Sequence, residues 1–130
     1  MSFNHAVIWI DHVAAHVQHF DADASVLENV ISKSTHPHLH VKAGTYGTGR
    51  ASENVAYFDE VVTALGAGSA ILIVGPASEK FEFQKYLVKK HLQLSKKIVG
   101  VEVMDHPTDG EVLKYAREYF NRVDRMQSIY

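Results

Sequence analysis

Three glycines, two basic side chains and a tyrosine fall within residues 42–50, KAGTYGTGR. Backbone amides beside glycine can cradle a phosphate, because no Cβ blocks the approach. Lysine and arginine neutralise phosphate charge, and a tyrosine ring stacks on an unpaired base. We therefore predict that this segment is a loop that binds RNA through Lys42, Gly44, Tyr46, Gly47, Gly49 and Arg50.

Three histidines alternate just before this loop, at His36, His38 and His40. Alternate residues of an extended chain share one face, and neutral imidazole is a common ligand of zinc, nickel and copper. Neighbours on that face lie about 7 Å apart, so the outer pair reaches one ion only if the chain bends, for example at Pro37. We predict no metal site and no cofactor, and these histidines are the weak candidate ligands.

Three aspartates point to a different chemistry. Asp11 follows the first apolar run, while Asp105 and Asp109 lie beyond the last one. Carboxylates that converge from such positions bind magnesium in nucleases and phosphodiesterases. Asp105 and Asp109 also flank the start of a predicted helix, where carboxylates accept hydrogen bonds from backbone amides and favour the helix dipole. We favour this capping role and keep a magnesium-dependent nuclease or phosphodiesterase as an alternative.

The composition limits the class of protein. A chain of 130 residues, of which 46% are hydrophobic, can bury one core, so we predict one domain over residues 1–130. Its 13 Lys and Arg against 15 Asp and Glu lack the basic excess of a general nucleic-acid binder, so RNA contact must be local and DNA is not an expected partner. The absence of cysteine fits a reducing compartment, and no apolar run is long enough for a membrane span. We expect a cytoplasmic protein with no membrane partner.

The elements that must position these residues begin with strands. Apolar or alternating runs at 5–10 and 13–20, joined by a tight connection, predict a β-hairpin, and residues 25–34 are predicted as its third strand. Apolar residues at helical spacing from Val55 to Leu65 then predict a helix that is capped by Ser52 and ended by Gly66.

Two buried strands and two helices follow. The runs SAILIVG (69–75) and IVGVEVM (98–104) are typical of strands covered on both faces. One helix is predicted from Ser78, and another from a cap at Thr108 or Asp109 to about Phe120. The order βββ-αβαβα requires crossover connections, so we predict an α/β fold with a mixed five-stranded sheet and helices on both faces.

Residues 75–120, GPASEKFEFQKYLVKKHLQLSKKIVGVEVMDHPTDGEVLKYAREYF, resemble the second half of the middle domain of archaeal and eukaryotic peptide-release factors. The same domain occurs in Pelota-type ribosome-rescue proteins and in small bacterial translational-machinery relatives. The resemblance covers most of the chain and is most specific at Gly75-Pro76, at Lys89-Lys90 and in the turn from Asp105 to Gly110. It implies a three-layer, ribonuclease-H-like topology and a ribosomal partner, contacted through tRNA or rRNA.

One motif of that family is missing. Release factors carry Gly-Gly-Gln on the loop that enters the first helix, where it helps water attack the peptidyl-tRNA ester, whereas this chain has GTYGTGR at 44–50. The resemblance therefore does not imply hydrolase activity, and Pelota-type proteins act on ribosomes without that tripeptide. We predict a non-enzymatic ribosome- or RNA-associated module that works through residues 42–50. A self-associating scaffold is a further alternative, with the C-terminal RMQSIY as the segment to truncate in testing it.

Overall fold

Strand β1 (His5–Ile10) lies at the centre of a five-stranded sheet, and five of its six residues are buried. The structure is a computed structural model that describes residues 3–32, 46–66 and 69–128, with the backbone alone over 46–54 and 125–128. Strand β1 pairs antiparallel with the strand that follows it and parallel with a strand more than 60 residues later. This central position explains why its sequence is apolar on both faces.

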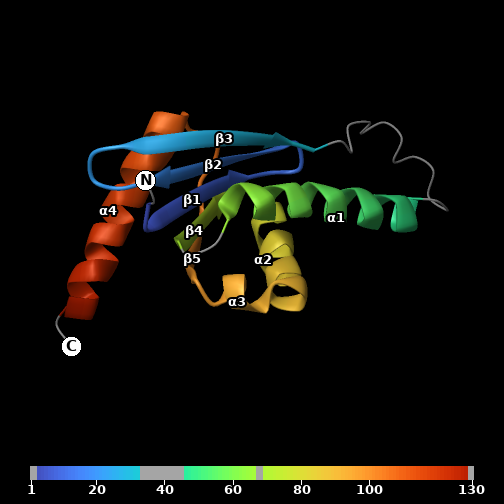
Figure 1. Cartoon of the computed structure of the whole chain (residues 1–130). Helices are drawn as coiled ribbons and strands as arrows, with labels where there is room; N and C mark the ends of the chain where they lie inside the picture. The colour runs from blue at the N-terminus through green and yellow to red at the C-terminus, as the bar shows by residue number, and fades with distance from the viewer. Residues whose placement is uncertain (1–2, 33–45, 67–68, 129–130) are drawn as a thin grey trace.

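The remaining elements follow in the predicted order, with one short helix added: β2 (Ala14–Phe20), β3 (Ser25–Ile31), α1 (Tyr46–Leu65), β4 (Ala70–Gly75), α2 (Glu79–Lys90), α3 (Leu92–Ser95), β5 (Ile98–Val103) and α4 (Asp109–Ser128). The strand order in the sheet is β3-β2-β1-β4-β5. The first three strands form an antiparallel meander, and β1, β4 and β5 are parallel to one another. The predicted mixed five-stranded sheet is confirmed (Figure 1).

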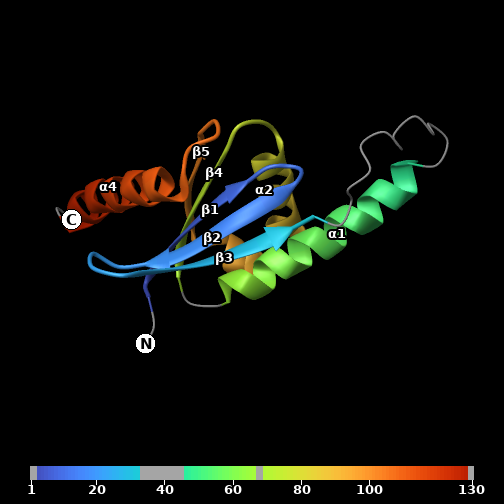
Figure 2. The same ribbon diagram turned by 90° about the horizontal axis from the view of Figure 1, so that it is seen from above.

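Helices cover both faces of the sheet and create two separate cores. On one face, Ile8 belongs to a cluster with Phe58 of α1 and Phe83 of α2. On the other face, Val7 belongs to a cluster with Phe120 of α4. Successive residues of a strand point to opposite faces, so both cores draw on β1 and β4. Figure 2 shows α4 on the side of the sheet away from α1 and α2, which confirms the predicted three-layer α/β arrangement.

Two predicted helix boundaries are confirmed. Gly66 ends α1 with a φ of 65°, and its N–H donates to the carbonyl of Val62, a common way for a glycine to close a helix. Thr108 caps α4: its Oγ1 accepts from the N–H of Glu111 at 3.1 Å, and the Glu111 carboxylate accepts from the N–H of Thr108 at 2.8 Å. This reciprocal pair is a capping box.

The predicted start of α1 was wrong. The helix begins at Tyr46, so Ser52 lies inside it and is not its N-cap. Residues 42–50 were predicted as a loop because glycine allows backbone angles that other residues resist, and each glycine in a helix interior also costs about 1 kcal/mol. Once the C-terminal half of α1 is anchored on the sheet, each further residue adds a backbone hydrogen bond without a new nucleation cost.

The second half of the chain differs from prediction in two smaller ways. Helix α4 continues to Ser128 instead of ending near Phe120, and Oδ2 of Asp124 on this extension lies 3.7 Å from Nε2 of His5. The helix predicted from Ser78 breaks at His91, and the separate helix α3 follows. Within the residues described, no helix is both long and apolar enough to cross a bilayer.

Candidate functional site

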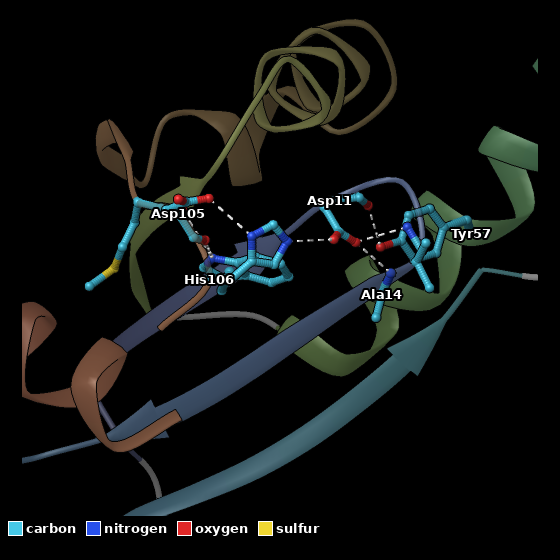
Figure 3. A network of polar contacts seen from close by, with 8 residues as sticks. Asp11, Ala14, Tyr57, Asp105 and His106 are labelled. Carbon is cyan, nitrogen blue, oxygen red and sulfur yellow. Dashed lines mark hydrogen bonds and ion pairs between the residues drawn. The ribbon is translucent and has the colours of Figure 1, made fainter. Parts of the chain in front are cut away.

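The parallel strands β1, β4 and β5 end at the same edge of the sheet, and polar residues follow each of them there. Asp11 and His12 follow β1, Ser78 and Glu79 follow β4, and Asp105 and His106 follow β5. In open α/β sheets the carboxyl ends of parallel strands are the usual place for ligands. We call this region the carboxyl edge (Figure 3).

Asp11 organises the turn between β1 and β2. Its Oδ1 accepts from the backbone N–H groups of Val13 at 2.8 Å and Ala14 at 2.9 Å. Its carbonyl oxygen accepts a 2.9 Å hydrogen bond from the hydroxyl of Tyr57 on α1. Burial raises the pKa of Tyr57 above its ordinary value, and the nearby charges of Asp11 and Glu79 raise it further, so Tyr57 remains a donor. This bond ties α1 to the carboxyl edge.

His106 lies between two carboxylates. Its Nε2 is 3.7 Å from Oδ2 of Asp11, and its Nδ1 is 3.0 Å from Oδ1 of Asp105. The Trp9 ring lies 5.2 Å from the imidazole, and the Trp9 indole N–H donates to the carbonyls of Met104 at 3.1 Å and Asp105 at 2.8 Å. The segment that carries His106 is therefore held onto β1.

A second imidazole–carboxylate pair lies on the same edge. Nδ1 of His12 is 2.9 Å from Oε1 of Glu79, whose side chain is 5% exposed. The neighbouring Lys80 is also buried, and its ammonium donates to the carbonyl of Ala77. Sequence reasoning singled out neither His12 nor His106 as a site residue. The available signal was a histidine directly after an aspartate at the end of an apolar run, at 11–12 and again at 105–106.

The three aspartates of the magnesium alternative do not form one ligand set. The Asp109 side chain lies against β2: its Oδ1 is 3.2 Å from Nδ1 of His16, and the two atoms are not aligned for a hydrogen bond. The Asp105 side chain is 92% exposed, and one oxygen of Asp11 is already bonded to two backbone amides. Within the described residues, no three carboxylate, imidazole or thiol side chains are grouped to hold a metal ion. The geometry therefore gives the magnesium alternative no support.

The predicted RNA-binding residues are divided between two parts of the chain. Lys42 and Gly44 lie outside the described residues, as do His36, His38 and His40, the weak candidate metal ligands. The other four, Tyr46, Gly47, Gly49 and Arg50, were predicted as loop, but they belong to the first turns of α1.

The start of α1 extends past the carboxyl edge. Tyr57 reaches that edge, and eleven residues precede it in the helix, which at about 1.5 Å per residue is a projection of about 16 Å. Figures 1 and 2 show this part of α1 beyond the ends of the strands. We call residues 46–56 the α1 arm. No acidic residue lies in its first turn, whereas the carboxyl edge carries several carboxylates that repel phosphate. Of the two surfaces, the first turn of the arm therefore repels an anion less.

Comparisons with known proteins agree with this architecture. A Pelota protein of Thermoplasma acidophilum superposes with a TM-score of 0.61 at 20% identity, over 85% of this chain and 31% of that one. The Pelota of Archaeoglobus fulgidus gives a TM-score of 0.58 at 11% identity, over 99% and 38%, and an archaeal translation termination factor, aRF1, gives 0.56 at 14%, over 95% and 39%. This chain shares its fold with part of those proteins. It spans between three and four tenths of their length, and no protein-family model and no curated protein matches its sequence.

Proposed function

We propose that this protein is a non-enzymatic, translation-associated module that contacts ribosomal RNA or tRNA through residues 42–50. The observation that carries the proposal is the fold shared with a translation termination factor and with two Pelota proteins, the families that the sequence resembles. Most of this chain matches about a third of each of those proteins, so we propose that residues 1–130 correspond to one domain of theirs. A ribosomal partner also favours a cytoplasmic location.

The α1 arm supports an RNA contact physically. The first four backbone N–H groups of a helix have no partner within the helix, and the helix dipole places partial positive charge beside them. In α1 these groups belong to residues 46–49, two of which are glycines. A phosphate can therefore approach this backbone closely. In the sequence, Lys42 precedes this helix end and Arg50 follows it, so each can add a positive charge to the contact, and Tyr46 adds a ring for base stacking.

The position of the arm supports the same proposal. The Tyr57–Asp11 hydrogen bond and the burial of Phe58 and Val61 fix the helix on the sheet, so the arm is carried by a rigid element. Its projection of about 16 Å lets it enter an RNA groove or interface while the acidic carboxyl edge stays back. Catalysis of ester hydrolysis is not part of the proposal, because Gly-Gly-Gln is absent from residues 44–50.

Binding of fluorescently labelled tRNA, measured by anisotropy between 50 and 200 mM salt, tests the local contact. A Lys42→Ala, Arg50→Ala double variant removes two phosphate contacts, so the slope of log K against log salt should fall by about 1.5 and the affinity at low salt by about tenfold or more. The control is a Lys85→Ala, Lys89→Ala double variant, which also removes two positive charges, but from exposed positions on α2. An equal loss of tRNA affinity in the two double variants would show a general effect of net charge and contradict the proposal.

A further inference from the structure

Strand β3 forms one edge of the sheet, beside β2 (Figure 2). Within the described residues no further strand pairs with its outer side. Six of its seven residues are exposed, and they include the apolar Val26, Leu27 and Ile31, which are 55%, 43% and 56% exposed. Natural edge strands are usually protected by lysine, proline or a bulge. The sequence SVLENVI has no lysine and no proline, and β3 pairs with β2 without a break in register.

The hydrogen bonds at the two ends of β3 establish which backbone groups point outward. The N–H of Ser32 donates to the carbonyl of Val13, and the N–H of Asp21 donates to the carbonyl of Ala24. Hydrogen-bonded pairs alternate along an antiparallel ladder, so the even-numbered residues of β3 bond to β2. The backbone N–H and C=O groups of the odd-numbered residues, from Ser25 to Ile31, therefore point away from the sheet.

The side chains of the same odd-numbered residues share one face. Val30 belongs to the core under α1, so Leu27, Asn29 and Ile31 lie on the opposite face, the one that α4 covers elsewhere. An antiparallel copy of β3 centred on Asn29 would place Leu27 against Ile31 of the partner subunit, and Ile31 against the partner subunit's Leu27. Glu28 would then face Val30 of the partner subunit and not its own copy. A register centred on Glu28 would instead oppose two like charges.

We propose that β3 pairs with β3 of a second copy of this chain, antiparallel and about a two-fold axis at Asn29, which joins two five-stranded sheets into one. The partner is a second copy because, in this register, the outward N–H and C=O groups of both β3 strands bond to each other. The register also brings Leu27 and Ile31 of each copy into contact with the same residues of the other. A contact of one strand pair is smaller than the roughly 800 Å² per partner of a stable complex, so the dimer forms at high protein concentration. This inference is independent of the proposed RNA contact, and its tests contain no nucleic acid.

Cross-linking tests the register directly, because the chain has no cysteine of its own. In an Asn29→Cys variant the two cysteines would form a hydrogen-bonded pair with Cα atoms about 5.5 Å apart, within the range of a disulfide. The matched control is Leu27→Cys, which is also exposed and on the same face. In this register the Cα atoms of the two copies of residue 27 lie about 14 Å apart, too far for a disulfide. We expect Asn29→Cys to form a covalent dimer at least tenfold faster under mild oxidation.

A faster reaction of Leu27→Cys, or equal rates for the two variants, would overturn the pairing centred on Asn29. The noncovalent test is sedimentation velocity of the full chain from 5 to 500 µM. We expect a concentration-dependent dimer that Ile31→Lys abolishes and Val26→Lys, on the other face of the same strand, largely preserves. A wild-type chain that stays monomeric throughout this range would overturn the proposal.

Discussion

Gly75, the last residue of β4, provides the sharpest test of the sheet that positions the carboxyl edge. A Cβ added at this position would lie 2.3 Å from the backbone oxygen of Ile10 on β1, whereas real Cβ atoms essentially never approach closer than 3.0 Å. The neighbouring atom belongs to the backbone, so Gly75→Ala must push β1 and β4 apart by about 0.7 Å. That movement also strains the bond from the Met104 N–H to the Gly75 carbonyl, which leads into the segment of His106.

Overpacking of this kind typically costs 1–3 kcal/mol, and the rigid contact favours the upper half of that range. We expect Gly75→Ala to lower the free energy of unfolding by about 2–3 kcal/mol in urea titrations and the Tm by about 6–10 °C. The control is Gly110→Ala in the first turn of α4, where the nearest atom to the added Cβ is Thr108 Oγ1 at 3.9 Å. Alanine favours a helix, so this variant should be neutral or stabilised by up to about 1 kcal/mol. A Gly75→Ala protein within 0.5 kcal/mol of wild type would refute the close approach of β1 and β4.

Three further predictions concern turns and contacts outside the sheet. Tyr57→Phe removes the donor to the Asp11 carbonyl and should cost about 1 kcal/mol in urea unfolding, and no change would mean that this bond does not anchor α1. Thr108→Ala breaks the capping box of α4 and should cost about 0.5–2 kcal/mol, with Thr108→Ser as the variant that restores it. Hydrogen bonds from the backbone of Asp23 and Ala24, followed by the charge of Arg117, lower the pKa of Asp21. The contribution of the Asp21 carboxylate to stability is therefore present above the ordinary aspartate pKa of 3.8 and is lost as the pH falls through the lowered pKa. The Asp21→Asn variant should therefore lose less stability than wild type as the pH is lowered below about 4. An unchanged dependence of unfolding free energy on pH would contradict this reasoning.

Much of the fold could be predicted because local sequence and tertiary environment agree. The apolar runs of β1 and β4 match strands that have a helix layer on each face. Gly66 and Thr108 marked helix ends correctly, since the positive φ and the capping box are local chemistry. The start of α1 was missed for the opposite reason: its glycines disfavour a helix locally, and the anchor at Tyr57 lies several residues further on.

The candidate site was harder to predict because its contacts are not local. His106 meets Asp11 across 95 positions of sequence, and His12 meets Glu79 across 67, so their pairing depends on the sheet order. A single sequence reveals that Asp11 and Asp105 end strands, but not that a histidine separates them. The contact of Asp109 with His16 of β2 is also non-local, and it leaves the three aspartates without a shared magnesium site.

Sedimentation of the protein with purified ribosomes, over a salt series, tests the central claim most directly. The comparison is between wild type and a Tyr46→Ala, Arg50→Ala double variant, whose folding is checked first by urea unfolding. The account predicts co-sedimentation at low salt that weakens steeply as salt rises and is largely lost in the double variant. Wild-type protein that stays in the supernatant at low salt, or a double variant that pellets as well as wild type, would contradict it.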